Sequence, residues 1–244
     1  MKRIFTAAVM AVAALTGLSL AGPGVVSAGA SSQAAAALIG NQYNKGSAGY
    51  RMTGGGWRFR YIKTTLTVPA STTRATNAQV GLMSPEDAIA LTLKSGGGPG
   101  SISYDISYWD TAKTLAVAPS PGDQVTISIY EDRAARKDYF TAVDLSTGAR
   151  DTAVEGFYPY LFEWAWVKGG GPTWSLASSN TRLWAFKDTQ LTSTGGTHGT
   201  LLGPWPSYRI IGTRGGTSTG AVVLRPTYPW NNGHNFSVMW RAAS

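Results

Sequence analysis

The sequence lacks cysteine entirely and is poor in charge and in histidine. Its 244 residues contain no cysteine, two histidines and 14% charged residues, whereas about 25% charged residues is usual for a soluble domain. The absence of cysteine excludes disulfide frameworks, thiolate zinc sites and a cysteine nucleophile. Because His198 and His234 are the only histidines, a histidine-rich metal centre is not expected either. The sequence therefore predicts no metal and no other cofactor.

The sequence is instead rich in apolar residues and in residues that form turns. Apolar residues account for 43% of the chain, and there are 30 glycines, 12 prolines, nine tryptophans and 11 tyrosines. This apolar content is enough for one sizeable core, which argues against disorder. The many glycines and prolines predict a fold with short elements and frequent turns.

The first 28 residues are predicted to be a secretory signal peptide. Lys2 and Arg3 precede an uncharged apolar run over residues 4–20, and Val26-Ser27-Ala28 supplies small residues for cleavage. The run is shorter than the roughly 20 residues that span a bilayer. We therefore expect cleavage without a stable membrane anchor, and a secreted, extracellular protein.

Two further segments follow the predicted signal peptide. Residues 29–46 are predicted to be a leader, a linker or the remnant of a propeptide, and residues 47–244 a single domain. Two of the 21 basic residues lie in the signal peptide, and the others are scattered singly along the chain. Scattered basic residues serve solubility as well as binding, so no nucleic-acid partner is predicted. We expect the mature protein to be a monomer.

From Tyr50 onward the sequence alternates with a period of two residues. Val125, Ile127 and Ile129 lie on one face of a predicted strand, and clusters of glycine, proline or asparagine interrupt the pattern every 8 to 15 residues. This pattern is typical of antiparallel all-β folds. The most compact solution is an antiparallel β-sandwich of two large sheets packed face to face.

The predicted strand over residues 57–68 has arginines and aromatic residues in an irregular order. Trp57, Phe59 and Tyr61 alternate with Arg58 and Arg60 before the pattern turns aliphatic. One interpretation is a β-bulge that switches the two faces of the strand. The other is an aromatic stripe on an outer face that binds a ligand.

Glu163 is a single carboxylate in another predicted strand. It shares a face with Leu161, Ala165 and Val167. Burial among such neighbours would raise its pKa and make it a general acid or base. The alternative is an ordinary ion pair with a neighbouring lysine or arginine.

Residues 216–220 match the Gly-x-Ser-x-Gly pattern of serine hydrolases. That motif requires a strand before it and a helix after it. Here the apolar strand-like run 221–224 follows, so we predict a hairpin turn.

Several short motifs, in their order, resemble the secreted glutamic peptidases, the eqolisins. They include Ala48-Gly49-Tyr50, Gln79-Val80-Gly81, Phe162-Glu163-Trp164 and Trp184-Ala185-Phe186, with further matches at 66–69, 104–108, 121–123, 144–148 and 233–240. The resemblance covers about residues 47–241. It implies two seven-stranded antiparallel sheets of the concanavalin A-like or jelly-roll type, with substrate held on a concave sheet.

The resemblance also implies a site. Glu163 falls on the position of the family's catalytic glutamate, and Lys94 falls on the position of its glutamine. The aromatic residues expected near the substrate are Trp57, Phe59, Tyr61, Trp109 and Trp164. An active member would be an acid endopeptidase of the glutamic type, cleaving an extracellular polypeptide.

Lys94 in place of glutamine changes what this site can do. An ammonium within ~4–6 Å of a carboxylate lowers its pKa by about 1–3 units, which opposes the general-acid step. We therefore expect a peptidase-like protein whose activity is weakened or lost. The alternative is a secreted module that binds carbohydrate or peptide, such as a cell-wall glycan, without catalysis.

Overall fold

The computed structural model describes residues 38–53, 55–69, 75–96, 98–106, 111–156, 161–171 and 181–241. The predicted signal peptide and Trp109 lie outside these residues. All the regular structure described is β-strand, and no helix among these residues is long and apolar enough to cross a membrane.

The strands follow one another along the chain with short connections. Their bounds are β1 (Leu38–Lys45), β2 (Ser47–Thr53), β3 (Phe59–Thr67), β4 (Thr76–Met83), β5 (Ala88–Ser95), β6 (Ser101–Asp105), β7 (Lys113–Leu115), β8 (Gln124–Asp132), β9 (Lys137–Asp144), β10 (Arg150–Gly156), β11 (Trp164–Gly170), β12 (Thr181–Ser193), β13 (His198–Gly199), β14 (Ser207–Thr213), β15 (Val222–Pro226) and β16 (Phe236–Trp240).

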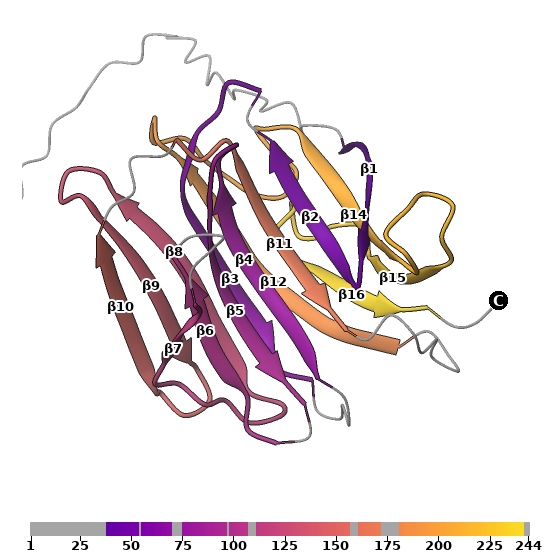
Figure 1. Ribbon diagram of the computed structural model, residues 1–244, viewed down its shortest axis with the longest axis horizontal. Helices are drawn as coiled ribbons and strands as arrows, with labels where there is room; N and C mark the ends of the chain where they lie inside the picture. The colour runs from indigo at the N-terminus through magenta and orange to yellow at the C-terminus, as the bar shows by residue number, and fades with distance from the viewer. Residues whose placement is uncertain are drawn as a thin grey trace, which may run out of the picture. The chain divides into compact units, whose positions relative to one another are not determined.

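Hydrogen bonds connect the strands in one continuous path that folds over into two layers. The first sheet has the order β7-β6-β5-β4-β11-β2-β14, and the second has the order β10-β9-β8-β3-β12-β16-β15. The path passes from one sheet to the other where β14 pairs with β15. Strands β3 and β8 contact β4 and β5 across the layers. Figure 1 shows β8, β9 and β10 at one side and β1, β14 and β15 at the other. The predicted antiparallel sandwich of two large sheets is confirmed.

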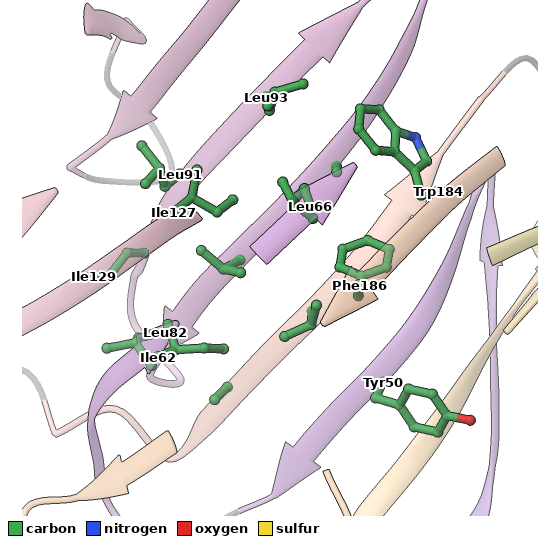
Figure 2. Packing of buried hydrophobic residues seen from close by; sticks show 14 of the residues in the cluster. Tyr50, Ile62, Leu66, Leu82, Leu91, Leu93, Ile127, Ile129, Trp184 and Phe186 are labelled. Atoms are coloured by element: carbon green, nitrogen blue, oxygen red, sulfur yellow. The ribbon is translucent and has the colours of Figure 1, made fainter. Parts of the chain in front are cut away.

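The core lies between the sheets because alternate residues of each strand point inward. In β8 the predicted face of Val125, Ile127 and Ile129 is fully buried. Figure 2 shows side chains of both sheets meeting in this core, among them Leu82 and Leu91 of the first sheet. At about 25 cal/mol per Å² of buried apolar surface, this shared core provides the main driving force for folding.

A second set of contacts joins the free edges of the two sheets. Glu155 in β10 accepts hydrogen bonds from Tyr104 Oη of β6 at 2.7 Å and from Lys113 Nζ of the edge strand β7 at 2.8 Å. The hydrogen bonds from Lys113 and Tyr104 lower the pKa of Glu155. Burial and its bond to Glu155 raise the pKa of Tyr104 to about 12. The sandwich is thus closed at this side by charged and polar contacts rather than by backbone pairing.

The structure differs from the predicted segment boundary at residue 47. Leu38–Lys45, expected to be leader or linker, forms β1 and pairs in parallel with β14. It adds an eighth strand to the first sheet, beside β14. The sequence of β1 is largely polar and shows no alternating apolar pattern, because most of its side chains face solvent rather than the core.

The irregular aromatic pattern of residues 57–68 is explained by a register shift. Tyr61 lies opposite Thr192 and Phe59 opposite Ser193, so an extra residue interrupts the β3–β12 ladder. Phe59 and Ile62 are therefore both fully buried although three positions apart. This is the face-switching bulge of the first interpretation.

Candidate functional site: a groove on the outer face of the first sheet

A groove of about 510 Å³ lies on the outer face of the first sheet. We call it the groove. It is lined by Gln42, Tyr43, Asn44, Arg51, Gln79, Met83, Ala88, Ala90, Asp105, Trp166, Lys168 and Ile210. These residues come from β1, β14, β2, β11, β4, β5 and β6, which are successive strands of that sheet. The groove therefore runs across the strands, and its floor consists of outward-pointing side chains.

The floor is built around Trp166 and a glycine beside it. Gly81 lies opposite Trp166 in the β4–β11 ladder. A Cβ at Gly81 would lie 2.0 Å from Cζ2 of Trp166, so the indole occupies the space that any larger residue would fill. Trp166 also packs with Ala88 and Ala90 in a small apolar cluster separate from the main core. Glycine and alanines at these positions let the ring lie flat across the sheet.

A hydrogen-bonded chain fixes the polar side of this floor. Nε1 of Trp166 donates to Oε1 of Gln79 at 2.9 Å, and Nε2 of Gln79 donates to the hydroxyl of Thr92 at 3.0 Å. Both ends of the Gln79 amide are thereby used. This chain orients the indole and the amide and leaves them few alternative conformations.

Two cationic side chains, Arg51 and Lys168, also line the groove. The guanidinium of Arg51 lies 4.7 Å from the ring centroid of Trp164, and Nζ of Lys168 lies 5.5 Å from that of Trp166. Both are within the range of cation–π attraction. Burial lowers the pKa of Lys168 and, likewise, that of Arg51. The groove thus holds positive charge in a partly dehydrated setting.

An acidic side chain lies at the far side of the groove. Asp105 in β6 lies in the same row as Trp166, separated from β11 by β4 and β5. Burial raises the pKa of Asp105, and the charge of Lys94 lowers it. With strands about 4.8 Å apart, Asp105 lies about 14 Å across the sheet from the β11 residues.

The structure does not bring Lys94 and Glu163 together. Lys94 lies opposite Asn77, which lies opposite Gly170 at the last position of β11. Glu163 immediately precedes the first residue of β11. At about 3.3 Å per residue, seven residues along the strand correspond to about 23 Å. The shared cleft implied for this pair is therefore not observed, because the two residues stand at opposite ends of the sheet.

Glu163 instead has a partner of its own. Oε1 of Glu163 lies 2.9 Å from Nη2 of Arg58, and both side chains are 31% exposed. This matches the ordinary ion pair that was the alternative interpretation of the glutamate. Ala165 and Val167 of β11 are fully buried as expected. Glu163 lies just before the first residue of β11, and there its neighbour Phe162, 1% exposed, enters the core instead.

The aromatic residues expected near the substrate are dispersed. Phe59 is fully buried against Trp205, with ring centroids 5.0 Å apart, and Trp57 packs edge-on against the same tryptophan at 5.8 Å. Tyr61 contacts Tyr130 in the second sheet. Of the four that the structure describes, only Trp164 lies next to a residue that lines the groove, with its ring beside the guanidinium of Arg51.

The sequence does contain a signal for the groove, which the reasoning from motifs missed. In β11, Trp164, Trp166 and Lys168 all share the outward face. An outward aromatic pair followed by a half-buried lysine is unusual for a face that only contacts water. Arg51 and Gln79 could not be added from the sequence, because only the β2–β11–β4 pairing places them there.

Two further kinds of site were considered from the sequence, the serine-hydrolase motif and a metal centre. The Gly-x-Ser-x-Gly segment lies in the turn between β14 and β15, as predicted, with Arg214 N donating to Ala221 O at 2.8 Å. Among the described residues there is no group of three or more histidine, aspartate or glutamate side chains that could bind a metal ion.

Comparisons with known proteins identify the fold. No family model matches the sequence, and no curated protein does. The crystal structure of scytalido-glutamic peptidase with a transition state analog inhibitor is similar, with a TM-score of 0.62 and 16% identity over 81% of this chain and 98% of that one. So is SCP-B, a member of the eqolisin family of peptidases in complex with the tripeptide Ala-Ile-His, with a TM-score of 0.57 and 15% identity over 81% and 99%. The described residues therefore have the concanavalin-like sandwich fold that the eqolisin structures share.

Proposed function

We propose that this chain is a secreted binding protein that holds an extended polypeptide in the groove. The observation that carries the proposal is the composition of the groove floor: the fixed Trp166–Gln79–Thr92 chain beside Arg51 and Lys168. An aromatic surface with oriented amide and charged groups is suited to a peptide backbone and its side chains. The eqolisin structures of the same fold contain a peptide-based transition state analog and a tripeptide.

The proposal includes the loss of the glutamic-peptidase reaction. That reaction requires a carboxylate to activate water beside the bound peptide bond. Glu163 is paired with Arg58 away from the groove. Among the described residues that line the groove, Asp105 is the only carboxylate, and the floor at β2 and β11 carries cations. The groove thus has aromatic and polar groups that can bind a peptide. It lacks the catalytic glutamate and glutamine side by side that the peptidase reaction uses.

A combined binding and cleavage assay tests this function. The protein recovered after expression of the full chain is titrated with a pool of fluorescein-labelled peptides of about seven residues, which span about 23 Å when extended. Fluorescence anisotropy measures binding, and mass spectrometry of the same samples measures cleavage between about pH 2 and pH 7. We expect saturable binding without turnover.

Two results would contradict the proposal. One is robust peptide cleavage that Glu163→Gln abolishes, which would establish Glu163 as the catalytic carboxylate. The other is the absence of peptide binding together with saturable binding of cell-wall polysaccharide, which would assign the groove to glycans.

A further inference from the structure

Arg51 and Lys168 form a pair of neighbouring cations on the groove floor. Arg51 lies opposite Trp166 in the β2–β11 ladder, and Lys168 is two residues further along β11. Such diagonal neighbours in antiparallel strands are about 7–8 Å apart. Gly49 lies opposite Lys168, and the backbone of β11 packs directly against it, since a Cβ at Gly49 would lie 2.1 Å from the carbonyl oxygen of Val167. Both side chains line the groove, so one anionic group of a ligand in the groove can approach the two cations together.

The described part of the chain provides no carboxylate for either cation. The ion pairs of Arg58 with Glu163 and of Lys113 with Glu155 lie outside the groove. Nε of Arg51 is buried without a hydrogen-bond partner, and the contact from its Nη1 to Oε1 of Gln42 is long, at 3.5 Å. A buried donor without a partner is costly, as is a partly buried charge without a counter-charge.

The surroundings favour a carboxylate as the counter-charge of the two cations. The planar guanidinium presents parallel N–H groups that match the two oxygens of a carboxylate. The rings of Trp164 and Trp166 shield the cations from one side and reduce their hydration. Reduced hydration strengthens the attraction to a bound anion.

We propose that the groove selects acidic polypeptides, with one carboxylate of the ligand bound between Arg51 and Lys168. This inference rests on the proposed function, because it names the chemistry of the peptide bound there. The carboxylate comes either from an aspartate or glutamate side chain or from the C-terminus of the peptide. Both sources make the same contacts, and the experiment separates them.

The test compares matched peptides by fluorescence anisotropy. The first peptide alternates glutamate with alanine and has an amidated C-terminus, the second has glutamine in place of each glutamate, and the third has glutamine with a free C-terminal carboxylate. Charge-assisted hydrogen bonds contribute about 1.5–3 kcal/mol, so the first peptide should bind about tenfold or more tightly than the second. A gain of similar size by the third peptide would identify the terminal carboxylate as the source.

Protein variants locate the effect. Lys168→Met preserves chain length over the Trp166 ring but removes the charge, and Arg51→Met does the same for the second cation. Each substitution should bring the ratio of the affinities for the first and second peptides close to one. Lys63→Met removes the same charge from an outward position of β3 in the second sheet, and it should leave the ratio unchanged. Thermal unfolding of each variant confirms that it is folded.

The outcomes distinguish this inference from the proposed function. If the glutamate and glutamine peptides bind equally well, acidic selection is contradicted while peptide binding stands. The same holds if Lys63→Met reduces the ratio as much as Lys168→Met does, since the effect then comes from net charge. If none of the peptides binds, both the inference and the proposed function are contradicted.

Discussion

Nη2 of Arg58 lies 2.9 Å from Oε1 of Glu163, and this ion pair joins the beginning of β3 in the second sheet to the beginning of β11 in the first. Beside it, the backbone N–H of Phe59 donates to the carbonyl of Phe162 at 2.8 Å. The two contacts hold the same end of the sandwich together. The glutamate that the sequence resemblance marks as catalytic thus has an identifiable structural partner.

The first prediction concerns this ion pair. Glu163→Gln should lower the free energy of unfolding by no more than about 1 kcal/mol, because both side chains are partly exposed and solvent screens their attraction. Peptide affinity should be unchanged. Urea unfolding and anisotropy measure the two effects. Arg58→Gln is the matched control, and the double variant should lose little more than either single variant. A large loss of peptide affinity in Glu163→Gln alone would contradict this structural role.

The second prediction concerns the groove floor. Gly81→Ala should displace the Trp166 indole, break its hydrogen bond to Gln79 and cost about 1–3 kcal/mol of stability, as overpacking usually does. The affinity for peptide should also fall, because the displaced indole is part of the groove floor. Gly156→Ala is the control, since nothing lies within 4 Å of a Cβ at Gly156, which is also in a strand. Equal effects of the two substitutions on binding and on tryptophan fluorescence would argue against the packing described.

The third prediction concerns a buried carboxylate in the second sheet. Glu131 lies opposite Asp138 in the β8–β9 ladder, and both are 1% exposed. Burial raises the pKa of Glu131 to about 7, with Asp138 adding to the rise and the nearby Arg133 and Arg60 opposing it. The folded protein therefore binds a proton at Glu131 that the unfolded chain, with a carboxyl pKa near 4.5, releases.

This difference sets the sign of the pH effect. The contribution of Glu131 to stability is fully present below about pH 4.5 and is lost as the pH rises to about 7, by about 3 kcal/mol in all. Glu131→Gln imitates the protonated form. Its free energy of unfolding should therefore equal that of the wild type near pH 4 and exceed it at about pH 8. Urea unfolding across this range measures the difference. A difference in the free energy of unfolding between wild type and Glu131→Gln that stays constant across this pH range would refute the assignment.

The fourth prediction concerns the charge of Lys168. Because burial lowers its pKa, the Lys168 ammonium should titrate below the ordinary value of 10.5, as followed by NMR of selectively labelled lysine. The penalty for burying protonated Lys168 is fully present below its folded pKa, and stability rises as the pH increases from that pKa to the ordinary value of 10.5. A bound acidic peptide should raise the pKa, since a carboxylate favours the charged form. A titration at or above 10.5 in the free protein would contradict the lowering of this pKa by burial.

The sandwich could be predicted from the sequence because its core imposes a period of two. Strands with one face in the core, such as β8 with Val125, Ile127 and Ile129, carry this period plainly. Strand β1 does not, because it pairs at the margin of the sheet through its backbone and carries polar side chains at Asn41, Gln42 and Asn44. Backbone pairing leaves little trace in a sequence.

The groove could not be assembled from the sequence for a related reason. Arg51, Gln79 and Lys168 are far apart along the chain and meet only through the order β2-β11-β4. The resemblance to the glutamic peptidases correctly indicated the fold. The shared cleft that it implied for Lys94 and Glu163 is not observed, because strand pairing places the two residues at opposite ends of the sheet.

The most direct test of the account is the NMR signal of the Trp166 indole N–H during titration with the acidic peptide. The signal is assigned by its loss in Trp166→Phe. The account predicts a saturable shift of this signal, because the peptide lies on the groove floor where the indole donates to Gln79. The indole of Trp205, buried on the other side of the sheet, should not move. Saturable binding by anisotropy with no change in the Trp166 signal would contradict the account and place the ligand elsewhere.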